Sequence, residues 1–203
     1  AEIPVINGGD GSNRHPTQAL LDLYTIKKFK GKIKGVKVTL YGDLRYARVA
    51  HSMTLGLAMF GADIVYTYPG DLSTPEEFLK EMREKYGVSK PLSVDPETAL
   101  KESDVIYHVG PIQDVMIGQK AVLSEEERQK TDQEFIKNFG INRDRLERLG
   151  VKDDLLIMHA LPRRYVDLDT SVDTTKHCGY FEEAGYGIPV RMALIALLLG
   201  LIE

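Results

Sequence analysis

The chain has 203 residues, 43% hydrophobic and 28% charged, which fits a globular domain and excludes global disorder. Its net charge of -4 gives no general reason to bind nucleic acid or a membrane surface. The apolar run Met192–Ile202 is shorter than the ~20 residues of a membrane helix. The single cysteine, Cys178, excludes an internal disulfide, and the first residues do not read as a signal peptide. We therefore expect a cytoplasmic protein.

The chain alternates between segments that predict helices and segments that predict strands. After a glycine-rich loop, the predicted elements are helix Pro16–Lys28, strand Val36–Tyr41, helix Arg48–Phe60, strand Ile64–Tyr68, helix Pro75–Tyr86, strand Leu92–Val94, helix Pro96–Glu102, strand Val105–Val109, helix Ser124–Asn138 and strand Leu155–His159. This alternation predicts an α/β, Rossmann-like fold, with a parallel sheet of about five strands and helices on both faces.

Ligands of such sheets bind beyond the C-terminal ends of the strands. These ends are Gly42-Asp43, Pro69-Gly70, Gly110-Pro111 and His159-Ala160, and three of them have candidate functional residues nearby. Residues 113–150 are rich in charged side chains, which is compatible with a solvated helix and loop or with a mobile loop that covers substrate. Six lysines between positions 27 and 37 are interpreted as a solvated helix end and loop, because the run has no arginine and no ladder of aromatic residues.

His15 and Gln18 are three residues apart at the start of the first predicted helix, so we expect them to project from one face of its first turn. Free backbone N–H groups and the positive end of the helix dipole favour a carbonyl or phosphate there. The same positive potential keeps His15 neutral, so that it can donate one N–H to a carbonyl oxygen. The alternative is that both residues only cap the preceding loop.

Two further segments carry candidate ligand-binding residues. The segment Gly42–Arg48 lacks the glycine spacing of a dinucleotide site, but its arginines could grip carboxylates in bidentate fashion. In His159–Arg163, Pro162 stiffens the loop after the last strand and biases Leu161 toward an extended backbone, so that carbonyls there could accept hydrogen bonds from an amino group. The alternatives are surface arginines and a tight loop with a buried histidine. His177 and Cys178 have no partners at zinc-ligand spacing, so no metal site is expected.

Taken together, these segments resemble the aspartate/ornithine carbamoyltransferase family, most closely its aspartate branch. The segments that carry the resemblance, in chain order, are Pro4–Gly11, His15–Gln18, Gly42–Tyr46, His51-Ser52, His159–Arg163, Tyr180-Phe181, Ala184–Gly187 and Arg191–Leu194. Several motifs in the expected order are more specific than any one of them.

The resemblance implies a division of the chain and a partner. Residues 1–30 would be the end of the carbamoyl-phosphate-binding domain with a crossing helix, 31–186 the amino-acid-binding domain, and 187–203 a second crossing helix. The family's phosphate-binding Ser-x-Arg-Thr motif does not occur in the chain. A separate carbamoyl-phosphate-binding domain or subunit is therefore expected, and the family implies a homotrimer.

The resemblance also implies carbamoyl transfer from carbamoyl phosphate to the amino group of L-aspartate, a step of pyrimidine biosynthesis that requires no cofactor or metal. His15 would hydrogen-bond the carbamoyl oxygen, and Gln18 would orient the carbamoyl amino group. The implied substrate-binding residues are Arg48, Gln113, Leu161, Pro162 and Arg163.

The sequence departs from the aspartate branch at two places. After the fourth strand the branch expects Thr-Arg-x-Gln-x-Glu, whereas Tyr107–Asp114 has no arginine and matches Gln113 only with a shift of one residue. Ala160 stands where the branch has proline. A different acceptor amine, or a non-catalytic binding or regulatory domain of the same fold, therefore stays open.

Overall fold

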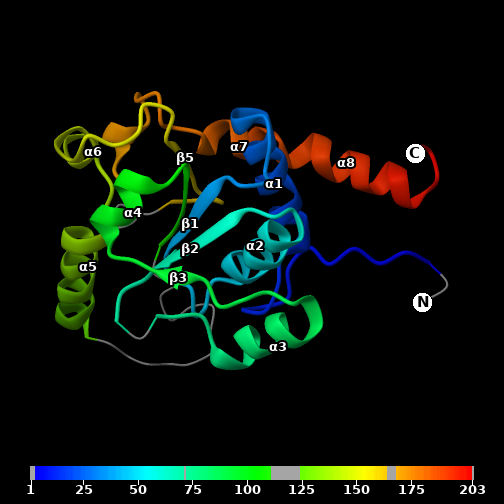
Figure 1. The fold of residues 1–203 in the computed structure, drawn as a ribbon, viewed down its shortest axis with the longest axis horizontal. Helices are drawn as coiled ribbons and strands as arrows, with labels where there is room; N and C mark the ends of the chain where they lie inside the picture. The colour runs from blue at the N-terminus through cyan, green and yellow to red at the C-terminus, as the bar shows by residue number, and fades with distance from the viewer. Residues whose placement is uncertain (1–2, 71, 111–123, 164–167, 203) are drawn as a thin grey trace.

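Five parallel strands form a single sheet in the order β3-β2-β1-β4-β5 (Figure 1). The computed structural model describes residues 3–70, 72–110, 124–163 and 168–202. The strands are β1 (Lys37–Gly42), β2 (Asp63–Thr67), β3 (Leu92–Ser93), β4 (Val105–Val109) and β5 (Leu156–Met158). The predicted fold class is confirmed, and every predicted strand agrees with the structure to within one residue at each end.

Helices connect the strands and flank the sheet. They are α1 (Pro16–Lys30), α2 (Arg48–Met59), α3 (Glu76–Tyr86), α4 (Pro96–Glu102), α5 (Glu125–Phe139), α6 (Arg143–Leu149), α7 (Tyr180–Gly185) and α8 (Gly187–Leu198), with a short 3-10 turn η1 (Thr170–Val172). Sequence analysis did not predict α6, although Asn142 caps its start by accepting a hydrogen bond from Arg145 N, and Gly150 ends it in the left-handed conformation.

Each face of the sheet has its own hydrophobic core. One face packs against α1, α2 and α3, with Leu40 and Tyr107 among its strand residues. The other face packs against α4, α5, α6 and α7, with Tyr41 and Ile106 on the strands. Adjacent strand residues thus point to opposite cores, as expected for a parallel sheet covered on both sides.

The order of the strands reverses between β1 and β4, which places a topological switch point at the C-terminal ends of these strands. Gly42 and Val109 are paired there. Gly42 has a φ of 118°, and a Cβ on it would lie 1.8 Å from the carbonyl oxygen of Val109, so only glycine fits. The chain can therefore turn sharply from β1 toward α2 at this edge of the sheet.

The two terminal helices pack together. Tyr24 on α1 and Tyr186 before α8 form an edge-to-face pair with ring centroids 5.0 Å apart. Beyond this contact, α8 projects from the body on the same side as the N-terminal segment (Figure 1). Its exposed large apolar residues are Ile188, Met192, Ile195, Leu197 and Leu198. Within the described ranges, no helix is both long enough and apolar enough to cross a membrane.

Candidate active site

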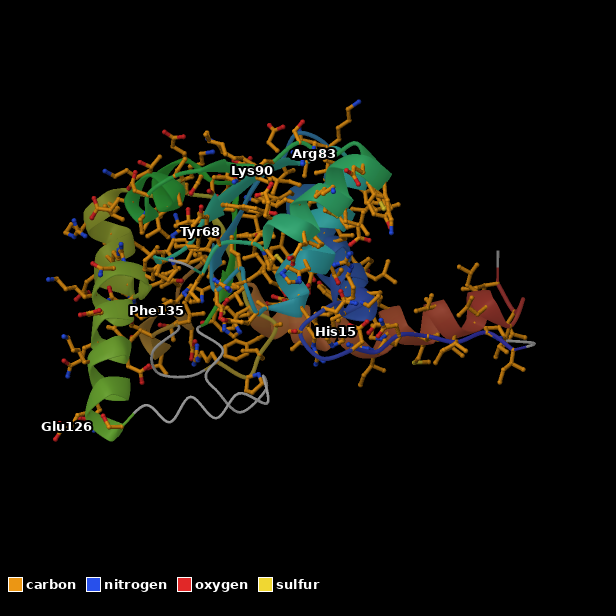
Figure 2. The ribbon with its side chains drawn as sticks, turned by 90° about the horizontal axis from the view of Figure 1, so that it is seen from below. His15, Tyr68, Arg83, Lys90, Glu126 and Phe135 are labelled. Carbon is orange, nitrogen blue, oxygen red and sulfur yellow. The ribbon has the colours of Figure 1, made fainter. Side chains whose placement is uncertain are left out.

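The loop before α1 is held against α2. Its Asp10 accepts hydrogen bonds from Arg14 N at 2.5 Å and from Asn13 Nδ2 at 3.0 Å, which closes a compact turn. His15 is the residue before α1, and its backbone N–H donates to Ser52 Oγ of α2 at 2.8 Å. His15 therefore lies where the N-terminal segment joins the body of the molecule (Figure 2).

The imidazole of His15 is half-buried and lies in a positive electrostatic environment. Burial is the largest cause that lowers the pKa of His15, and the charges of Arg48 and Arg191 lower it further. The ring is therefore neutral at pH 7, as predicted, although burial and two guanidinium groups are the causes rather than the helix dipole alone. A neutral imidazole can donate a single N–H to a carbonyl oxygen.

Gln18 is buried on the first turn of α1. Its Nε2 donates to Asp22 Oδ1 at 2.9 Å, and the hydroxyl of Tyr107 donates to Asp22 Oδ2 at 2.8 Å. Because Asp22 accepts from the amide nitrogen of Gln18, this buried contact sets which way the carbonyl and amino ends of the Gln18 side chain point.

The segment between β1 and α2 folds around a buried aspartate. Asp43 Oδ1 accepts from the backbone N–H groups of Arg45 and Tyr46, both at 3.0 Å. This turn delivers Arg48 as the first residue of α2, and its Nη1 donates to the carbonyl oxygen of Gly11 at 3.4 Å. The guanidinium thus lies against the glycine-rich loop, within electrostatic reach of His15.

The bend after β5 is anchored by its histidine. The backbone N–H of His159 donates to Glu183 Oε2 at 2.9 Å, and Leu161 N donates to His159 Nδ1 at 2.9 Å. Nδ1 is thus an acceptor, which leaves the ring proton of the neutral form on Nε2. Leu161 adopts a φ of 52° and is followed by a cis bond to Pro162, so the backbone is not extended here, contrary to the sequence prediction.

Arg163 is engaged by protein groups. Its Nη2 donates to Asp173 Oδ2 at 2.6 Å, its Nη1 also bonds to Asp173, and Nη1 donates to the hydroxyl of Tyr180 at 3.0 Å. This ion pair fastens the bend to the segment before α7. Binding of substrate by Arg163 stays a prediction, and Gln113 lies outside the described residues.

Two sets of contacts thus involve four of the predicted groups. His15 lies in the field of Arg48, Gln18 is bonded to Asp22, and the bend at His159 is bonded to Glu183, whose side chain contacts Asp22. In the described part of the chain, no three His, Cys, Asp or Glu side chains cluster so as to hold a metal ion.

Comparison with known families decides the relationship. Residues 34–198 match the Asp/Orn binding domain of aspartate/ornithine carbamoyltransferases, and residues 1–28 match part of the carbamoyl-P binding domain of the same family. The chain belongs to the aspartate/ornithine carbamoyltransferase family. The family predicted from the sequence motifs is therefore confirmed.

The chain is similar to individual members of the aspartate branch. The chain is 43% identical over 203 residues to the aspartate carbamoyltransferase catalytic subunit of Thermococcus kodakarensis and 42% identical over 206 residues to that of Thermococcus onnurineus. In both cases the match covers 100% of this chain and 61% of the relative. The chain therefore spans about three fifths of the length of these carbamoyltransferase subunits.

Solved structures of the family share the fold. The catalytic subunit of M. jannaschii aspartate transcarbamoylase superposes with a TM-score of 0.78 at 34% identity, covering 98% of this chain and 60% of that one. Ornithine carbamoyltransferase from Pyrococcus furiosus superposes with a TM-score of 0.76 at 32% identity, covering 100% and 62%. The fold is thus common to the aspartate and ornithine carbamoyltransferases.

Sequence reasoning missed the residues that hold the candidate groups in place. Ser52 fixes the backbone of His15, Asp22 and Tyr107 fix Gln18, and Glu183 fixes the bend after β5. One signal was available, because Asp22 lies four residues after Gln18 among the apolar residues of the first predicted helix. The contact between Asp22 and Glu183 joins segments 161 positions apart and leaves no local pattern.

Proposed function

We propose that this chain supplies the amino-acid-binding half of a carbamoyltransferase that transfers the carbamoyl group of carbamoyl phosphate to L-aspartate. The observation that carries the proposal is the neutral imidazole of His15, half-buried in the field of Arg48 and Arg191. The guanidinium groups attract anionic substrates, while the neutral ring can donate to a carbonyl oxygen. The aspartate carbamoyltransferase subunits that match at about 40% identity support aspartate as the acceptor.

In the proposed reaction the neutral α-amino nitrogen attacks the carbamoyl carbon. A C–N bond forms, the bond between the carbamoyl carbon and the phosphate oxygen breaks, and phosphate leaves with the bonding electron pair and takes up the proton that the nitrogen loses. Negative charge builds on the carbamoyl oxygen during the attack. His15 stabilises that charge by donating its N–H, and Gln18 orients the carbamoyl amino group.

In the proposal, other groups hold the amino acid that accepts the carbamoyl group. Arg48 pairs with a carboxylate of aspartate, and the carbonyl oxygens of Leu161 and Pro162 accept hydrogen bonds from the amino groups of the reactants. Fixing both reactants in register supplies much of the acceleration, because the reaction becomes effectively intramolecular.

The proposal includes a partner that binds carbamoyl phosphate. Five large apolar residues of α8 are exposed, and a helix that is apolar on all sides is normally covered. The matched relatives are longer than this chain, and the family includes a carbamoyl-P binding domain of which residues 1–28 match only a part. We assign α8 and α1 to the contact with that domain, in an assembly that is a homotrimer.

Reconstitution tests the proposal. The chain is combined with the part of the Thermococcus kodakarensis subunit that it does not match, and carbamoyl-aspartate is measured after addition of carbamoyl phosphate and aspartate. We expect turnover with the wild-type chain and a loss of about 10²–10³-fold in kcat for His15→Ala, because one donor to the developing oxyanion is removed. Circular dichroism checks that the variant is folded.

Two outcomes would favour other functions. Turnover with a different amine and none with aspartate would favour another acceptor, in line with the missing arginine after β4. Stable association with the added half, but no turnover with any amine in a panel, would favour a non-catalytic binding or regulatory domain.

A further inference from the structure

Two acidic side chains meet in the interior between α1 and α7. Asp22 is 0% exposed and Glu183 is 1% exposed, and their carboxyl groups are in hydrogen-bonding contact. Burial raises the pKa of Asp22 to about 7 and that of Glu183 well above its usual range. The negative charge of Asp22 raises the pKa of Glu183 further, whereas the hydrogen bond with Glu183 lowers the pKa of Asp22. The pair therefore keeps at least one proton at neutral pH.

The hydrogen bonds around the pair show where that proton belongs. Asp22 Oδ1 accepts from Gln18 Nε2, Asp22 Oδ2 accepts from the hydroxyl of Tyr107, and Glu183 Oε2 accepts from His159 N. Glu183 Oε1 is buried and meets no donor within the described ranges of the chain. Two carboxylates can contact each other only through a proton, so Glu183 Oε1 carries it and donates to Asp22.

We propose that Asp22 and Glu183 share one proton and thereby hold the Gln18 amide and the bend after β5 in a fixed relation, as positioning residues of the candidate site. The chain of bonds runs from Gln18 through Asp22 and Glu183 to the backbone of His159, and from His159 Nδ1 to Leu161 N. The proposal rests on the proposed function, since Gln18 and the bend are the groups assigned there to substrate.

Loss of the shared proton would open this connection. With both groups ionised, the contact would be between two acceptors in the interior, and repulsion would separate α1 from α7. Four groups face the pair. They are Gln18 on α1, Tyr107 on β4, the backbone N–H of His159 after β5 and the positive charge of Arg191 on α8. Arg191 favours the charge on Asp22, which is consistent with Glu183 as the proton carrier.

Two substitutions separate the shared proton from the hydrogen bonds. Glu183→Gln keeps an oxygen for His159 N–H and supplies an N–H to Asp22, so it preserves the connection at every pH but removes the titrating proton. Asp22→Asn places an amino group opposite the Gln18 amino group, which then loses its acceptor, or opposite the Tyr107 hydroxyl, which must then accept instead of donate. The first variant serves as the conservative control for the second.

Nuclear magnetic resonance on the full chain tests the pair without any activity. In the wild type, we expect a carboxyl carbon that titrates near or above pH 7, and Gln18 side-chain amide signals that shift with the same midpoint. In Glu183→Gln the Gln18 signals should not depend on pH in this range, and in Asp22→Asn they should be displaced at every pH. The proposal would be overturned if the Gln18 side-chain amide signals of the wild type did not shift while the carboxyl group titrates.

Kinetics in the reconstituted enzyme provide a second arm. We expect kcat of the wild type to fall at alkaline pH, kcat of Glu183→Gln to be flat over the same range, and Asp22→Asn to lose about 10²-fold in kcat with little change in KM. Identical pH profiles for the wild type and Glu183→Gln would overturn the positioning role. Absence of turnover in the wild type would instead overturn the proposed function, while the resonance experiment still decides whether the pair positions Gln18.

Discussion

At the scale of single residues, His15 gains its chemical character from neighbours that are distant in the sequence. Arg48 comes from the start of α2 and Arg191 from α8, and both act on the ring at the start of α1. Neither position could be assigned to His15 from spacing. The neutral ring is thus a property of the folded chain rather than of the local motif.

The first prediction concerns the titration of His15. Burial and two guanidinium charges lower its pKa, so the folded chain binds fewer protons than the unfolded chain just below pH 6.5 and this group's contribution to stability falls as the pH drops there. Arg48→Gln should raise the pKa of His15, because one of the positive charges is removed. The measurement is a proton resonance titration of the imidazole.

Arg45→Gln is the matched control for this titration. Arg45 is exposed, belongs to the same turn, and is not among the largest causes of the shift in the pKa of His15. Equal midpoints in the two variants would show that Arg48 does not act on His15 through its charge, and the proposed attraction of anionic substrate would lose its support.

The second prediction concerns Gly42. A Cβ there would lie 1.8 Å from the carbonyl oxygen of Val109, so Gly42→Ala should force β1 and β4 apart and destabilise the fold by about 3 kcal/mol or more. Gly87→Ala is the control, because Gly87 also has positive φ but no heavy atom within 4 Å of the added Cβ. The control should lose about 1–2 kcal/mol in urea unfolding. Equal losses would mean that the close approach at Gly42 is unimportant.

At the scale of elements, hydrophobic patterns and turn residues predicted all five strands and the helices α1 to α5. Apart from β3, whose two residues are exposed, these elements have one or two buried faces, and the hydrophobic pattern follows burial. The helices α6 and α7 were missed, since 7 and 6 residues are too few to show a period. The equally short α4 was predicted because Pro96 marks its start. The location of the candidate site at the C-terminal ends of the strands stays a prediction, and the partner of Arg163 and the contact of Asp22 with Glu183 depend on tertiary packing that no local pattern encodes.

The third prediction belongs to α8. Ile188 and Met192 are 72% and 64% exposed and lie one turn apart on this helix. Changing both to Glu should leave the stability of the isolated chain within about 0.5 kcal/mol, because little is buried. It should weaken association with a carbamoyl-phosphate-binding half at least tenfold, measured by isothermal titration calorimetry.

Leu92→Glu is the control for this surface. Leu92 is 69% exposed, but it lies on β3, the strand at the edge of the sheet. It should not change the association. Unchanged affinity in the α8 variant would show that this apolar surface has another use.

At the scale of the whole molecule, one buried connection joins both faces of the sheet. Asp22 belongs to α1, which packs on the core that contains Tyr107, whereas Glu183 belongs to α7, whose Tyr180 packs in the other core. The pair therefore links two cores that are otherwise separated by the sheet, and its protonation should be visible in the global free energy of unfolding.

The fourth prediction is that the contribution of this pair to the free energy of unfolding falls as the pH rises from about 4 toward 7 and above. The folded chain retains protons on Asp22 and Glu183 that the unfolded chain has already lost, so it binds more protons in this range and is destabilised by raising the pH. Each unit by which a pKa is raised corresponds to about 1.4 kcal/mol. Glu183→Gln should reduce the slope, because one of the two raised groups no longer titrates.

Glu182→Gln provides the comparison, because Glu182 is an exposed acid on the same helix and undergoes the same substitution. Urea unfolding at a series of pH values should give parallel curves for the wild type and Glu182→Gln, and a flatter curve for Glu183→Gln. Comparing the variants cancels the contribution of other acids. Asp173 is one of these, and because its pKa is lowered, its contribution to stability increases as the pH rises. Three parallel curves would show that the buried pair holds no proton in excess of the unfolded chain, and the connection from Gln18 to the bend after β5 would then lack its central bond.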